Sequence, residues 1–165
     1  MGAAFQKPLD HLDQMSNAQK NGHFLGEYRH TIDDKNRVTV PVSWRGVEGC
    51  ETLYMVPHPS KTCIMVMPLE EYNRKGDEVA ASPALSAAQK KSFERLYYSQ
   101  VKEVSIDKQG RLLVADAQRQ VVGMETDVVL VGGRFRFDIW GSEKWDAVHK
   151  KDDVAYEEVG DVIGF

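Results

Sequence analysis

The sequence lacks the features of secreted, membrane-spanning and disulfide-stabilised proteins. It has 165 residues and two cysteines, Cys50 and Cys63, too few for a disulfide framework. Either they form one incidental bridge or, as we expect, they are free thiols. No apolar run approaches the roughly 20 residues that a membrane-spanning helix needs, and residues 1–23 lack the basic start and apolar stretch of a signal peptide. These absences predict a cytoplasmic protein with no membrane partner.

Positive charge is also scarce. The 21 lysines and arginines are outnumbered by 25 aspartates and glutamates, so the formal net charge is −4. A protein that holds DNA through its phosphates usually has a basic excess. Any DNA-binding surface must therefore be local. The hydrophobic content of 42% is enough for one compact domain or two small, closely packed ones.

Arrangements typical of catalysis or metal binding are missing too. No Ser/His/Asp set or carboxylate pair stands out. Cys50, His58 and Cys63 match no common zinc spacing and lack a fourth ligand. Gly132-Gly133 lies between two apolar strands, whereas a phosphate-binding loop would need a helix after it. We therefore expect no enzyme, no metal site, no cofactor and no small-molecule substrate.

One strand-turn-strand pattern occurs twice in the chain. β-Prone runs flank a four-residue turn within residues 28–41 and again within residues 101–114. The offset of 74 residues that relates the two turns also carries residues 54–56 onto 128–130, so each half is the same supersecondary unit. The fourth turn position needs a left-handed conformation, which asparagine and glycine tolerate best. The two turns are Asp33-Asp34-Lys35-Asn36 and Asp107-Lys108-Gln109-Gly110.

This repeat predicts an α+β fold, mainly β, of two pseudo-symmetric modules with short helices. Ser86 and Gln89 form a capping-box candidate ahead of an apolar stripe, which predicts a helix between the halves. A second helix is expected after Pro68, and a third with Ser142 as its N-cap. The expected organisation is a disordered extension over 1–23, a first domain over 24–81, a linker helix over 82–100, a second domain over 101–151 and a frayed acidic tail over 152–165.

Each hairpin carries an aspartate and an arginine four residues apart, a DxxxR motif. Such an aspartate can bond the turn's own amides and pair with the arginine, so the motif can be only a structural staple. Its repetition favours two exposed cationic tips suited to a regular polyanion such as double-stranded DNA. The residues that we expect to reach DNA are Lys35, Arg37, Lys108 and Arg111. The residues expected to orient them or shape the turns are Asp33, Asn36, Asp107 and Gly110.

The segments FLGEYRHTIDDKNRVTVP, SIDKQGRLLV, VVLVG and FDIW resemble the MraZ family, over about residues 24–151. The resemblance implies tandem AbrB-like domains forming a swapped-hairpin β-barrel, and a ring-shaped homo-oligomer. It also implies a nucleoid-associated repressor that binds short direct repeats in its own promoter, at the division and cell-wall gene cluster. The chain has Asn36 where the family usually has glycine. It has Ala115 after the last hairpin strand, where the family typically has proline, which predicts a less rigid exit.

Two other functions compete with this interpretation. An oligomeric scaffold of the same fold that has lost DNA binding would agree with the net charge and the acidic tail. An AbrB-like antitoxin usually has one such hairpin per chain, so the presence of two argues against it. Salt-dependent binding to a promoter fragment would separate these possibilities.

Overall fold

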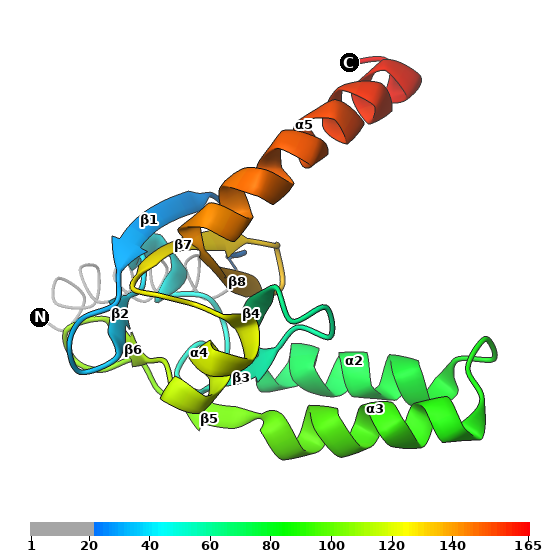
Figure 1. Cartoon of the computed structure of the whole chain (residues 1–165), viewed down its shortest axis with the longest axis horizontal. Helices are drawn as coiled ribbons and strands as arrows, with labels where there is room; N and C mark the ends of the chain where they lie inside the picture. Colours follow the sequence, from blue (N-terminus) through cyan, green and yellow to red (C-terminus); the bar gives the residue numbers. More distant parts are fainter. Residues whose placement is uncertain (1–21) are drawn as a thin grey trace, which may run out of the picture.

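The computed structural model describes residues 22–165, and its strands form two antiparallel sheets. The larger sheet has six strands in the order β1-β7-β8-β4-β3-β5, and β2 pairs with β6 (Figure 1). The predicted extension over residues 1–23 falls almost entirely on residues 1–21, which lie outside the described part. The strands are β1 (Glu27–Thr31), β2 (Arg37–Thr39), β3 (Leu53–Pro57), β4 (Cys63–Pro68), β5 (Lys102–Val104), β6 (Arg111–Leu113), β7 (Asp127–Gly132) and β8 (Phe137–Gly141).

Strands of each half of the chain pair with strands of the other half. β1 pairs with β7, β2 with β6 and β3 with β5, all antiparallel. Each of these three pairings joins the first half to the second. The α+β architecture with antiparallel sheets is as the sequence predicts, and the two halves are joined through their sheets. The expectation of a mainly β fold with short helices is wrong, because the three longest helices have 13, 14 and 22 residues.

The two halves also share one hydrophobic core. Val38 of β2 and Leu112 of β6 are opposite each other and fully buried. An aromatic cluster lies in the same core, where the Trp44 ring contacts Phe24 and Phe137 at centroid distances of 5.8 and 4.9 Å. Burial of such rings removes a large apolar area from water. The hairpin strands therefore sit on a core that neither half could build alone.

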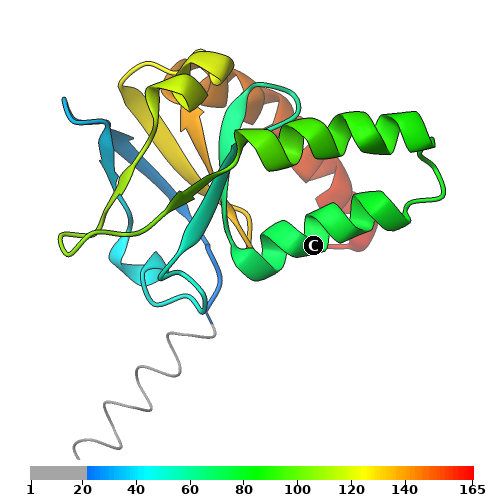
Figure 2. The same ribbon diagram turned by 90° about the horizontal axis from the view of Figure 1, so that it is seen from below.

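Helices close and extend this sheet structure. The capping box is present: Ser86 Oγ accepts from the Gln89 amide at 3.1 Å, and the Ser86 amide donates to Gln89 Oε1 at 2.9 Å. The predicted linker helix α3 is one arm of a helical hairpin that extends from the sheet (Figure 2). The rings of Tyr72 and Tyr97 stack across it at 4.5 Å. The helices are the 3₁₀ turn η1 (Val42–Trp44), α2 (Leu69–Ala81), α3 (Ala87–Gln100), α4 (Asp116–Val122) and α5 (Ser142–Ile163).

The prediction of a frayed tail over residues 152–165 is wrong. α5 continues to Ile163 and ends at Gly164, which has a φ of 91°. The segment contains no proline, and glycine at the helix end takes the left-handed conformation that terminates a helix. Its N-cap is Gly141 and not Ser142, which is the first helical residue. Beyond Lys151 the helix extends away from the sheet and has no buried residue (Figure 1).

The exits from the two hairpins have the same backbone conformation. Pro41 has φ −52° and ψ 139°, and Ala115, 74 residues later, has φ −62° and ψ 139°. Each is the N-cap of the helix that follows, η1 or α4. Ala115 already adopts the φ that proline would impose. The less rigid exit at Ala115 stays a prediction, because a shared backbone conformation does not measure rigidity.

We expect Ala115→Pro to stabilise the protein by about 0.4–1 kcal/mol, because proline restricts the unfolded chain at a position whose folded φ suits it. No hydrogen bond from the Ala115 amide to another described residue is lost. The measurement is urea unfolding followed by circular dichroism. Pro41→Ala is the matched control and should lose a similar amount. A less stable Ala115→Pro variant would contradict the comparison of the two exits.

Candidate nucleic-acid interface

The first hairpin turn is held by a single aspartate. Asp33 Oδ1 accepts hydrogen bonds from the backbone amides of Lys35 at 2.9 Å and Arg37 at 2.8 Å. Its Oδ2 accepts from Arg37 Nε at 2.9 Å. Asn36 has a φ of 61°, in the left-handed region that the sequence predicts for it. Both carboxylate oxygens of Asp33 are thus used within four residues of chain.

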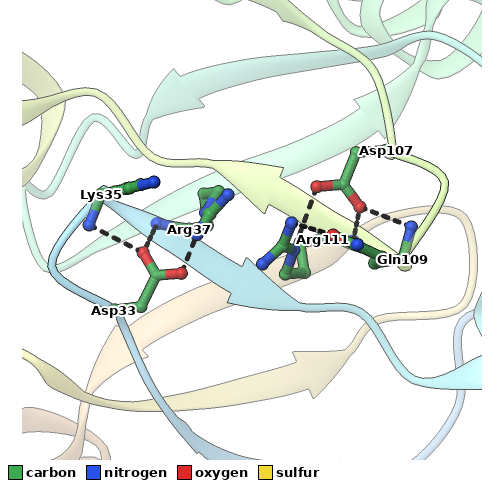
Figure 3. Close-up of polar contacts among 6 residues, drawn as sticks. All are labelled: Asp33, Lys35, Arg37, Asp107, Gln109 and Arg111. Atoms are coloured by element: carbon green, nitrogen blue, oxygen red, sulfur yellow. Dashed lines mark hydrogen bonds and ion pairs between the residues drawn. The ribbon is translucent and has the colours of Figure 1, made fainter.

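The second turn repeats these contacts. Asp107 Oδ1 accepts from the amides of Gln109 and Arg111, both at 2.9 Å, and Oδ2 accepts from Arg111 Nε at 3.0 Å. Gly110 has a φ of 79°. The second turn adds one contact, since Arg111 Nη2 also donates to the side-chain oxygen of Gln109 (Figure 3). The pairing expected within each DxxxR motif is present in both.

These contacts keep the two aspartates ionised. Hydrogen bonds from the Arg37 backbone, and then its side chain, lower the pKa of Asp33, and those from Arg111 and Gln109 lower the pKa of Asp107. Because the pKa of each aspartate is lower in the folded protein, its ionised carboxylate contributes stability that is fully present above the ordinary aspartate pKa. That stabilisation is lost as the pH falls through the folded-state value. At neutral pH both turns therefore hold a carboxylate against an arginine.

The arginines are less exposed than the sequence predicts. The side chains of Arg37 and Arg111 are 28% and 26% exposed, because each folds back onto its aspartate. Lys35 and Lys108 are exposed as expected. The two turns therefore expose their lysines to solvent, whereas each arginine is held in a fixed orientation by its aspartate.

Arg37 and Arg111 nevertheless lie on one face. In the β2–β6 register, Val38 is opposite Leu112, and this pair is buried in the core. Neighbouring strand residues point to opposite faces, so Arg37 and Arg111 lie on the outer face of the ribbon. Figure 3 shows them side by side between Asp33 and Asp107. The 74-residue offset relates Val38 to Leu112, so the two motifs are arranged about a pseudo-twofold axis at this pair.

Comparison with known proteins decides the family. A family model described as "MraZ protein, putative antitoxin-like" matches residues 98–158. The chain is 35% identical to a protein of Heliobacterium modesticaldum named "Transcriptional regulator MraZ", over 85% of this chain and 96% of that relative. A protein of the same name from Natranaerobius thermophilus is 31% identical over the same shares of the two chains. The chain belongs to the MraZ family.

Two arginines beside the turns of this MraZ chain were missed as site residues. Arg119 Nη1 donates to Asn36 Oδ1 at 2.7 Å. The guanidinium of Arg45 lies against Gly110, where a Cβ would overlap it. The 74-residue offset relates Arg45 to Arg119, so the repeat that located the motifs could also have located them.

Other conspicuous residues within residues 22–165 form no metal-ion site. Cys50 and Cys63 are buried free thiols, as predicted, and burial raises the pKa of each to about 12. A protonated thiol is a poor metal ligand. Within residues 22–165, no group of three or more His, Cys, Asp or Glu side chains is placed to hold a metal ion. No helix in that range is both long and apolar enough to cross a membrane.

Proposed function

We propose that the protein is a sequence-specific DNA-binding transcriptional regulator, a repressor that acts through the outer face of the β2–β6 ribbon and its two turns. The observation that carries this proposal is the placement of Arg37 and Arg111 on one face, each held by its own aspartate. The relatives named transcriptional regulators support it.

The geometry of Arg37 suits base-edge contact, whereas Arg111 keeps Nη1 available while its Nη2 donates to Gln109. Asp33 engages Nε of Arg37, and the terminal nitrogens of Arg37 donate to no described residue. A guanidinium with free terminal nitrogens can bind guanine O6 and N7, or clamp a phosphate. Because the aspartate fixes the side chain beforehand, less rotamer freedom is lost on binding. Lys35 and Lys108 would add phosphate contacts from the exposed tips.

We further propose that several copies act together as a ring on short direct repeats of the protein's own promoter, at the division and cell-wall gene cluster on the nucleoid. A chain of net charge −4 with one small cationic face gains affinity by linking such faces. Exposed apolar side chains on α5 beyond Lys151 offer a surface for another copy, and they are Val154, Tyr156, Val159, Val162 and Ile163.

The strand pairing supports a finer proposal for the fold. We infer that the exchanged pairs β1–β7, β2–β6 and β3–β5 make the two halves one swapped-hairpin barrel of the AbrB-like kind. In such a barrel each hairpin is held by the partner half. The two DxxxR turns would then be presented as one rigid unit to DNA.

The test is binding to a duplex that carries the sequence upstream of the protein's own gene. We expect the full chain to bind it in gel-shift titrations far more tightly than a scrambled duplex, with affinity falling steeply as salt rises, because phosphate contacts release counterions. Light scattering at the same concentrations should give a mass of several chains. An oligomer that binds neither duplex would instead establish the scaffold alternative.

A further inference from the structure

Arg119 belongs to the second half of the chain and contacts the hairpin turn of the first half. It lies on α4, and its Nη1 donates to the side-chain oxygen of Asn36 at 2.7 Å. Its Nη2 donates to the carbonyl of Glu125 at 3.0 Å. The side chain is only 15% exposed. Both terminal nitrogens are therefore committed to protein partners, so Arg119 has little capacity left for a ligand.

Arg45 makes the opposite crossing, from the first half to the second turn. Its Nε donates to the Val40 carbonyl at 2.9 Å, and the Val40 amide donates to the Gly110 carbonyl at 2.8 Å. The guanidinium covers Gly110, which is buried although it belongs to an exposed turn. Neither terminal nitrogen of Arg45 donates to a described residue. Unlike Arg119, Arg45 keeps its outer edge free.

Each crossing arginine is matched to the turn residue that it meets. Asn36 supplies an amide oxygen that Arg119 binds, whereas Gly110 supplies the space that Arg45 fills. A side chain at residue 110 would displace the Arg45 guanidinium. The difference between asparagine in one turn and glycine in the other is thus tied to a difference between the two arginines.

We propose that an arginine from the opposite half completes each turn: Arg45 is a further DNA-contacting residue that binds phosphate beside the second turn, and Arg119 is a positioning residue for the first. This inference rests on the proposed DNA-binding function. Arg45 lies against Gly110, which precedes Arg111 in the chain. Its two terminal nitrogens donate to no described residue, so they can donate to phosphate oxygens. Arg119 fixes the side chain of Asn36, and through Asn36 the peptide bond that joins it to Arg37.

Salt titration tests the role of Arg45. The probes are the upstream duplex and a scrambled duplex of equal length. We expect Arg45→Gln to weaken binding to both alike, and to reduce the slope of log affinity against log salt by about 0.9 for each subunit engaged. Arg45→Lys should restore the slope because it restores the charge. Arg95→Gln, an exposed arginine on α3, makes the same charge change away from the ribbon and should leave the slope unchanged.

A different signature is expected for Arg119. Arg119→Gln should lower the ratio of specific to scrambled-duplex affinity while leaving the salt slope as it is. Arg119→Lys should not rescue it, because one ammonium cannot reproduce the two directed bonds to Asn36 and Glu125. Asn36→Gly should lower the same ratio, and the double variant with Arg119→Gln should lose no more than Arg119→Gln alone, because the two residues act through one contact.

The outcomes separate this inference from the function on which it rests. If the unaltered protein binds the upstream duplex and Arg37→Ala abolishes binding, but Arg45→Gln keeps the full slope, the phosphate contact is refuted and the DNA-binding function stands. If Arg119→Lys binds like the unaltered protein, or Asn36→Gly and Arg119→Gln add independently, the positioning role is refuted. If the unaltered protein binds neither duplex, both the function and the inference are overturned.

Discussion

Replacing Arg37 or Arg111 by alanine is expected to reduce specific DNA binding severely while the fold remains intact. Loss of one bidentate arginine contact costs about 1–3 kcal/mol for each engaged subunit, which is roughly a 5-fold to 150-fold loss in affinity per contact. Several linked subunits would multiply the loss. The measurement is a gel-shift titration of each variant on the upstream duplex, with circular dichroism and thermal unfolding as checks of the fold.

The structure explains why these variants should fold. The core beneath the ribbon is filled by Val38 and Leu112, and neither arginine contributes to it. Alanine at residue 37 keeps the backbone amide that donates to Asp33, so the turn retains its two amide bonds. A suitable control is Arg95→Ala, which removes an exposed arginine on α3, away from the ribbon. Unchanged affinity in both ribbon variants would refute the proposed site.

The parts of the site that could be predicted from the sequence are those fixed by local chemistry. An aspartate that starts a turn and a residue that tolerates positive φ determine a hairpin within about five residues. The matched contacts of Asp33 and Asp107, and the positive φ of Asn36 and Gly110, are of this kind. Ser86 with Gln89 was predictable for the same reason, since a capping box is a contact across three residues.

The features that could not be predicted depend on contacts between distant parts of the chain. The pairing of β1 with β7 joins residues far apart in the chain, which no local pattern encodes. The repeat relates Arg45 to Arg119, but it does not indicate that each of them contacts a turn 65 or more positions away. The helix α4 has seven residues and no side-chain cap, so it leaves a weak periodic signal. Acidic composition indicated fraying after residue 151, but composition does not determine where a helix ends, and Gly164 does.

The arrangement of the operator raises a separate question, because the two hairpins of one chain are related by a pseudo-twofold axis. A true twofold reader mirrors its symmetry in a palindromic site. In this chain the tips differ, with Lys35 and Asn36 in one turn and Gln109 and Gly110 in the other, and their crossing arginines differ as well. We therefore expect one chain to recognise a directional DNA element.

Identical copies related by the rotation of a ring would meet DNA in the same orientation, so we expect tandem elements spaced by about one helical turn, roughly 10 base pairs. Inserting five base pairs between elements would turn alternate elements to the opposite face of the duplex. Affinity should then fall by the gain from linking, about 10²–10⁴-fold, although every element is retained. A ten-base-pair insertion is the matched control and should recover most of the binding. A footprint over an inverted repeat, or affinity indifferent to the five-base-pair insertion, would show that ring-based reading of direct repeats is wrong for this protein.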